Sequence, residues 1–231
     1  IPDDQITFQR ITGNGSAIVM KNPQYRLHKT LGVIKKNLLK IFPLVCDDFK
    51  IHIIRGRDEI LVSDFDRSIM GELCSVITLG DDFSALADLV QIGYPRRNEL
   101  IRQDATFEIP IVMRDKTDAE QKYTLKIRGW IGTYKSTRGR KSEITDFPDN
   151  FISLFANKKL GEFNILPVVG QNKLNEVYVV GQLHVDLFEL SELPDMALSN
   201  RQGYKSDDLR YQAVLKYVRE TLLPDVIRLR E

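Results

Sequence analysis

Three histidines are the first residues to consider for an active site in this chain. His28 opens a predicted helix, while His52 and His184 lie in predicted strands and alternate with apolar neighbours. A hydrolase of the Ser-His-Asp kind needs its histidine beside a nucleophile and an orienting acid, and none of the three has that setting. We therefore interpret them as structural histidines.

A metal-dependent nuclease site could be built from Asp104 and the motif Glu120-Gln121-Lys122. In such a site the carboxylates hold a divalent ion, and the lysine steadies the attacking water. The motif is short and common, and Glu120 stands at the expected end of a hairpin, where a solvated charge is the simpler interpretation. A nuclease that uses Glu120 is kept as an alternative. The spacing of the other His, Cys, Asp and Glu residues indicates no metal site.

A basic segment follows the clearest predicted hairpin and could contact DNA. Clustered cations bind nucleic acid because they release counterions from its phosphates. The chain as a whole has a net charge of +1, so no global field draws it to a polyanion. The segment is therefore either a local DNA contact or a solvated loop. Its cations are Lys135, Arg138, Arg140 and Lys141.

The polar loop between Leu193 and Asp208 offers another set of binding side chains. Asn200, Arg201 and Lys205 could hold an anion together, arginine through a forked pair of donors and lysine as a compact charge. The alternative is that Asn200 and Arg201 only tie the loop down through backbone hydrogen bonds.

Helices and strands must position these residues, and the first 65 residues predict a small set of them. An apolar stripe at helical spacing predicts one helix, with lysines on its solvated side. Period-two alternation on either side of a Gly-containing turn predicts hairpins. The expected elements are strands over residues 5–10 and 17–20, a helix over 27–41, and a hairpin formed by 49–53 and 59–62.

The rest of the chain predicts a longer series of strands and a final helix. The clearest hairpin joins residues 107–113 to 123–131, with Tyr123, Leu125 and Ile127 on one face. Ser206 is the expected N-cap of the last helix, and Pro224 must kink or restart that helix. Further elements are expected as strands over 70–79, 151–156 and 177–187, and a short helix over 85–90 that Asp82 or Ser84 would cap.

Three stretches of sequence resemble the transducer region of GHKL-type ATPases, nearest to bacterial ATP-binding proteins similar to MORC and MutL. They are Ser199-Asn200-Arg201-Gln202-Gly203-Tyr204-Lys205-Ser206-Asp207-Asp208, Gly161-Glu162-Phe163-Asn164-Ile165-Leu166 and Val179-Val180-Gly181-Gln182-Leu183-His184-Val185-Asp186. Gly15-Ser16 resembles the last Gly-Thr box of that family's nucleotide-binding domain, with serine in place of threonine. The family's earlier motifs are expected upstream of Ile1, where the natural start would also lie.

This resemblance implies an α+β fold in two parts. Residues 1–65 would be the strand, helix and hairpin that end a GHKL α/β sandwich. Residues 66–231 would be the transducer domain, with a mixed sheet packed by helices. The parent protein would bind ATP and magnesium, whereas this fragment alone would bind neither and would not be catalytic.

The resemblance also assigns roles to four residues. Lys205, with Arg201 as second choice, would meet the γ-phosphate of ATP in the neighbouring nucleotide-binding domain and couple it to closure of a homodimer. Ser16 and Asn200 would contact the nucleotide. The work of the parent would be related to DNA, and the rival hypothesis is a protein-interaction module without a nucleotide.

Composition is typical of a cytoplasmic globular protein. The hydrophobic content of 42% is enough for a buried core. Apolar runs stay well below the roughly 18 residues of a membrane span, so no membrane contact is expected. Cys46 and Cys74 are expected to be reduced thiols.

Overall fold

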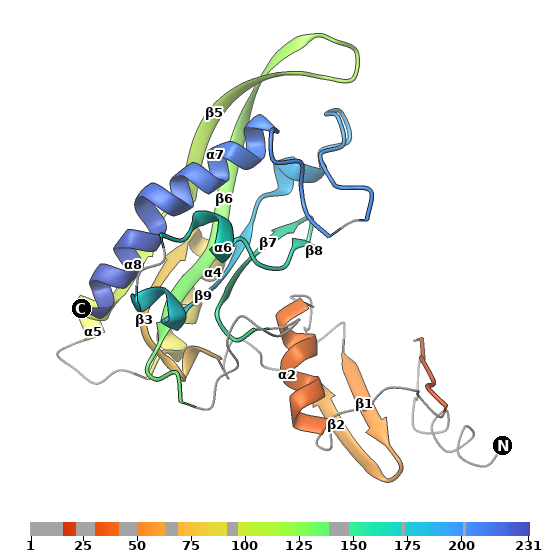
Figure 1. Cartoon of the computed structure of the whole chain (residues 1–231), viewed down its shortest axis with the longest axis vertical. Helices are drawn as coiled ribbons and strands as arrows, with labels where there is room; N and C mark the ends of the chain where they lie inside the picture. The colour runs from red at the N-terminus through yellow and green to blue at the C-terminus, as the bar shows by residue number, and fades with distance from the viewer. Residues whose placement is uncertain are drawn as a thin grey trace. The chain divides into compact units, whose positions relative to one another are not determined.

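The computed structural model describes residues 16–21, 31–41, 50–62, 69–91, 97–138, 148–171, 174–200 and 202–231. The chain divides into two compact units, Ile1–Phe65 and Asp66–Glu231 (Figure 1). Whether these units are the two domains named from the sequence stays a prediction.

The first unit contains one helix and one hairpin among its described residues. Helix α2 covers Leu31–Ile41, and strands β1 (Ile51–Arg55) and β2 (Asp58–Val62) pair antiparallel around a turn in which Gly56 has a φ of 62°. This hairpin confirms the alternation seen in the sequence. Lys40 is buried, so α2 does not keep all its lysines on a solvated side.

Two predictions for the start of the chain have a different outcome. Residues 17–20 form no strand, and Ile18 and Met20 are exposed. The strand expected over residues 5–10 and the first residues of the expected helix lie outside the described residues.

The second unit is built on a seven-stranded mixed sheet. Its strand order is β4-β3-β6-β9-β7-β8, and β5 also pairs with β6. The pairs β3 with β4 and β7 with β9 are parallel, whereas the other pairs are antiparallel. The strands are β3 (Leu73–Leu79), β4 (Ile101–Asp104), β5 (Phe107–Arg114), β6 (Glu120–Tyr134), β7 (Phe151–Ala156), β8 (Lys159–Glu162) and β9 (Val179–His184).

Strand β6 is the central element of this sheet. Its second half pairs with β3 on one side and β9 on the other, while its first half pairs only with β5 in the described part of the chain. The β5–β6 hairpin therefore extends beyond the rest of the sheet (Figure 1). Leu125 and Ile127 are fully buried and Tyr123 is partly buried, which confirms the predicted inner face.

A long C-terminal helical segment packs along the sheet. It consists of α7 (Leu209–Tyr217), a π-helical turn (Val218–Leu222) and α8 (Leu223–Arg230). Tyr211, Leu215, Val218 and Leu222 are buried along it, as their spacing predicts. The widened turn ends immediately before α8, and Pro224 lies in the first turn of α8.

Asp208, and not Ser206, is the N-cap of α7, because its carboxylate accepts a hydrogen bond from the backbone N–H of Arg210. The helix thus begins two residues later than predicted. The short helices are α4 (Asp81–Ser84), α5 (Arg97–Leu100), α6 (Leu166–Val169) and the 3-10 turns Ala85–Leu89, Leu174–Tyr178 and Asp186–Glu189.

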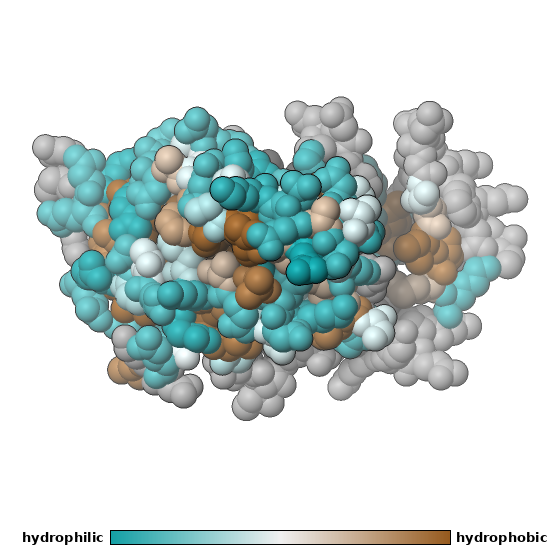
Figure 2. Space-filling model, turned by 90° about the horizontal axis from the view of Figure 1, so that it is seen from above, coloured by the Kyte–Doolittle hydropathy of each residue, from teal (hydrophilic) through white to brown (hydrophobic). Residues whose placement is uncertain are grey.

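The class of the second unit is α+β, with a mixed sheet packed by helices. This confirms the general fold prediction, whereas an arrangement specific to GHKL proteins is not shown. The core cluster draws on residues 77–227, and on the face seen in Figure 2 the coloured residues are mostly hydrophilic, with small hydrophobic groups among them. Within the described residues, no helix is long and apolar enough to span a membrane.

Candidate functional site

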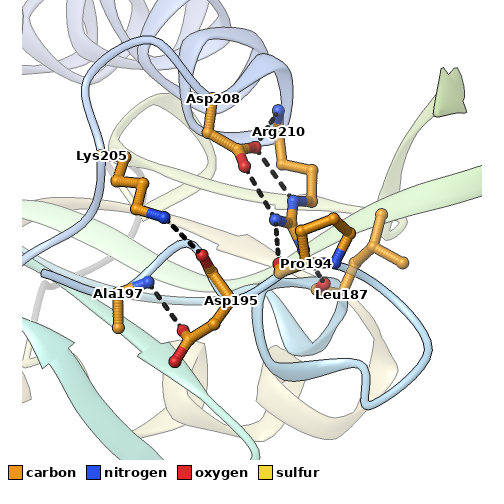
Figure 3. A network of polar contacts seen from close by, with 7 residues as sticks. All are labelled: Leu187, Pro194, Asp195, Ala197, Lys205, Asp208 and Arg210. Atoms are coloured by element: carbon orange, nitrogen blue, oxygen red, sulfur yellow. Dashed lines mark hydrogen bonds and ion pairs between the residues drawn. The ribbon is translucent and has the colours of Figure 1, made fainter. Parts of the chain in front are cut away.

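The loop that precedes α7 is organised by a buried arginine (Figure 3). The Arg210 side chain is fully buried, and its Nε and Nη2 donate to the two carboxylate oxygens of Asp208 at 2.9 and 2.7 Å. The same guanidinium donates to the carbonyl oxygens of Pro194 at 2.9 Å and Leu187 at 3.3 Å. Arg210 therefore joins the start of α7 to the backbone at Leu187 and at Pro194.

Electrostatics keep the Asp208 carboxylate charged in this setting. Burial alone would raise the pKa of Asp208, but the hydrogen bonds and positive charge of Arg210 outweigh it and hold the pKa below its ordinary value. The pair is a structural tie, since Nε and both terminal nitrogens of Arg210 donate to the protein's own oxygens.

Asn200 and Lys205, two of the residues predicted to hold an anion, lie in a small closed turn. Lys205 Nζ donates to the Asp195 carbonyl oxygen at 2.9 Å (Figure 3). An isolated bridge joins Ala197 to Tyr204. Asn200 Oδ1 accepts from the backbone N–H of Gln202 at 3.1 Å. These contacts fit the alternative of a loop tied down by its own backbone, although Lys205 stays exposed.

Two of the predicted residues cannot be joined to this turn. Arg201 lies outside the described residues. Ser16 is exposed in the first unit, and the two units have no defined placement relative to each other. The roles predicted for Lys205, Arg201, Asn200 and Ser16 are untested and stay predictions.

A buried polar cluster under the same turn has no counterpart in the sequence analysis. Tyr211 Oη donates to Glu162 Oε1 at 3.0 Å, and the Tyr204 ring lies 6.0 Å from the Tyr211 ring and against the backbone of Gly161. Burial raises the pKa of Glu162 against the lowering effect of the Tyr211 bond, and burial also raises the pKa values of Tyr204 and Tyr211. The sequence around Gly161-Glu162 did not predict that the Glu162 carboxylate would be buried.

The two described histidines, His184 and His52, serve a packing role and a surface contact. The His184 ring lies 5.1 Å from the rings of Phe83 and of Phe155, and burial, aided by the charge of Arg128, lowers its pKa to about 4. His184 is therefore neutral at physiological pH. His52 Nδ1 lies 2.7 Å from Glu59 Oε1 across the β1–β2 hairpin. His28 lies outside the described residues.

The predicted nuclease residues do not come together. Asp104 pairs with Leu79, which in turn pairs with Gly129, so Asp104 lies two strands away from Gly129. Glu120 is the first residue of β6 and lies nine residues before Gly129, about 30 Å away at roughly 3.3 Å per residue. Among the described residues, no group of three or more His, Cys, Asp or Glu could hold a metal ion.

Cations from two segments lie around the end of β6. Lys135 follows β6 directly, Arg138 is exposed three residues later, and Arg230 Nη1 donates to the Tyr134 carbonyl oxygen at 2.5 Å. Lys135 Nζ reaches the carbonyl oxygen of Gln91, which follows the 3-10 turn Ala85–Leu89. Arg140 and Lys141 lie outside the described residues.

Comparisons with known proteins give one informative similarity. No family model matches the chain, and no solved structure matches it. The chain is 22% identical over 219 residues to HgiDII of Herpetosiphon aurantiacus, which is named as a candidate type II restriction enzyme. The match covers 95% of this chain and 31% of that protein, so the chain spans about a third of its relative's length.

This similarity corrects three predictions made from the sequence. The chain matches a candidate restriction enzyme, so the relationship to GHKL-type ATPases and to MORC- and MutL-like proteins is wrong. The description as an ATPase transducer is corrected with it. The prediction that the parent protein uses ATP has no support from this relative and is also corrected. The predicted homodimer and the contact with a neighbouring domain are untested.

Proposed function

We propose that this chain is a DNA-contacting part of a restriction-type endonuclease. The observation that carries this proposal is the match to a candidate restriction enzyme over nearly the whole chain. Because the chain corresponds to about a third of that relative, the remainder of such a protein has room for a separate cleavage centre. The nuclease alternative is thus favoured as the activity of a whole protein, with magnesium as its metal.

The separation of Asp104 from Glu120 favours DNA contact, and not DNA cleavage, as the function of this chain. A metal-dependent cleavage centre needs carboxylates that converge on one ion. Asp104 accepts a hydrogen bond from Arg102 Nε at 2.9 Å, and Glu120 lies far along β6. Asp104 thus forms an ion pair, and Glu120 stands at the end of a hairpin.

The basic end of β6 is the surface that best fits a phosphate backbone. Phosphate contacts come mostly from Arg and Lys and need no aromatic stacking. Arg138 is exposed at the described end of this segment. Arg140 and Lys141 add two more cations to the same stretch of sequence. A local cluster of this kind binds DNA even when the net charge of the chain is close to zero.

The test is the salt dependence of duplex DNA binding, measured by fluorescence anisotropy with the 231-residue chain. We expect Arg138→Gln to weaken binding and to reduce the slope of log K against log salt by about 0.9 for each phosphate contact that the substitution removes. Lys216→Gln on the exposed side of α7 is the matched control and should leave the slope unchanged.

Equal slopes for all these variants would overturn the basic end of β6 as the DNA contact. A wild-type chain that binds no duplex DNA at low salt would overturn the proposed function as a whole.

A further inference from the structure

Lys135 is held in place by three main-chain carbonyls. Its backbone N–H donates to the carbonyl oxygen of Glu72 at 3.0 Å, and its Nζ donates to those of Gly71 at 2.9 Å and Gln91 at 3.1 Å. These acceptors lie just before β3 and just after the 3-10 turn at Ala85–Leu89. One lysine therefore ties the end of β6 to two other segments of the unit.

Arg230 holds the same point from α8. Its Nη1 donates to the Tyr134 carbonyl oxygen at 2.5 Å, and its guanidinium lies 3.6 Å from the centre of the Tyr178 ring. The next residue, Glu231, accepts from Asn175 Nδ2 at 2.8 Å. The backbone at Tyr134 and Lys135 is thus fixed by α8 as well as by the start of β3.

We infer that Lys135 is a positioning residue, which together with Arg230 fixes the start of the basic segment, and that the phosphate contacts begin at Arg138. This inference rests on the proposed function, because it assumes that the basic end of β6 contacts DNA. It assigns a positioning role to Lys135 and a phosphate contact to Arg138. Two of the three protons on Lys135 Nζ are already donated to carbonyl oxygens. Turning the ammonium toward a phosphate would leave both carbonyls without that partner.

Arg138 has the opposite character. Its backbone N–H donates to Ser136 Oγ at 3.1 Å, and its side chain is exposed. Three residues reach at most about 10 Å, so a fixed Lys135 confines where the Arg138 guanidinium can go. Confinement before binding reduces the ordering entropy that a DNA complex must overcome.

Salt dependence separates the two roles. Arg138→Gln should lower the slope of log K against log salt by about 0.9, because the variant makes one phosphate contact fewer. Lys135→Met should weaken binding by about threefold to tenfold because the segment is less ordered before binding, with the slope unchanged. Lys135→Arg keeps donors for both carbonyls and should restore the affinity. A slope that falls as much in Lys135→Met as in Arg138→Gln would overturn the inference.

A second measurement tests the tie without DNA. Hydrogen exchange at the amides of residues 134–136 should be at least several-fold faster in Lys135→Met, near wild type in Lys135→Arg and unchanged in Arg138→Gln. Unchanged exchange in Lys135→Met would overturn the tie itself. If exchange accelerates as expected but the wild-type chain binds no DNA, the proposed function fails while the tie stands, so the two failures are distinguishable.

Discussion

Arg210 is a fully buried charge whose hydrogen-bond partners belong to the protein itself. A buried arginine is tolerated only when its donors are matched, because an unpaired charge in the interior is costly. Asp208 matches the charge, caps α7 through the backbone N–H of Arg210 and remains ionised by virtue of its lowered pKa. One carboxylate therefore holds both the helix start and the loop before it.

We predict that Asp208→Ala lowers the free energy of unfolding by about 3–5 kcal/mol at neutral pH, because Arg210 loses its counter-charge while still buried. The pKa of Asp208 is lower in the folded state, so its contribution is present above the unfolded-state pKa and is lost as pH falls through the folded value. Urea unfolding across this acidic range checks the prediction.

The exposed neighbour Asp207 provides the matched control, and Asp207→Ala should change the unfolding free energy little. Asp208→Ala that is as stable as this control would contradict the role of the pair.

His184 makes the free energy of unfolding depend on pH in a second, separate pH range. Its folded-state pKa of about 4 lies below the ordinary value of 6.5, so the unfolded chain binds a proton first as pH falls. We predict that stability declines between pH 6.5 and about 4 by up to about 3 kcal/mol from this residue. His184→Gln should flatten that part of the profile in urea unfolding, and a profile as steep as wild type would refute the assignment.

At the scale of elements, the β5–β6 hairpin decides where chemistry can occur. It carries Glu120 along β6 and away from the strand ends where Asp104 lies. Asp104 lies level with Gly129, two strands away, and Glu120 lies about 30 Å from Gly129 along β6, so the two carboxylates cannot share a metal ion. The same extension leaves Glu120 exposed.

We therefore predict that Glu120→Gln has no effect on any magnesium-dependent nicking of DNA by a protein that contains this chain. A supercoiled plasmid assay with equal amounts of wild type and variant measures it. Loss of nicking in the variant, with unchanged unfolding stability, would restore Glu120 as a cleavage residue.

Elements with a strong local pattern were predictable from the sequence. The alternation of Tyr123, Leu125 and Ile127 and the helical spacing of Leu215, Val218 and Leu222 correspond to the buried faces observed. The start of α7 was predicted two residues early, because Ser206 and Asp208 are both acceptable caps and only the position of Arg210 distinguishes them. Residues 17–20, whose apolar pattern predicted a strand, form none.

The candidate sites were less accessible to sequence reasoning. Arg138 was identified by charge alone, but the ties of Lys135 to Gly71 and Gln91 join segments distant in sequence. The inward carboxylate of Glu162 likewise depends on Tyr211, 49 positions along the chain. Such contacts are set by the packing of the sheet, which a single sequence does not display.

For the whole molecule, the question is which part of the chain folds on its own. The core cluster of the second unit draws its buried residues from 77–227, and all seven strands of the mixed sheet lie in Asp66–Glu231. A domain of this size with its own core is normally stable in isolation. The domain boundary near residue 65 can therefore be tested by unfolding.

We predict that a fragment of residues 66–231 unfolds cooperatively in urea, with a midpoint close to the main transition of the 231-residue chain. The physical reason is that deletion of residues 1–65 removes no described strand from the mixed sheet and no residue from its core cluster. Circular dichroism and tryptophan fluorescence should report the same transition, because the single tryptophan, Trp130, is buried within β6. If the fragment shows a broad, non-cooperative transition, its sheet requires the first unit, and the two units fold as one.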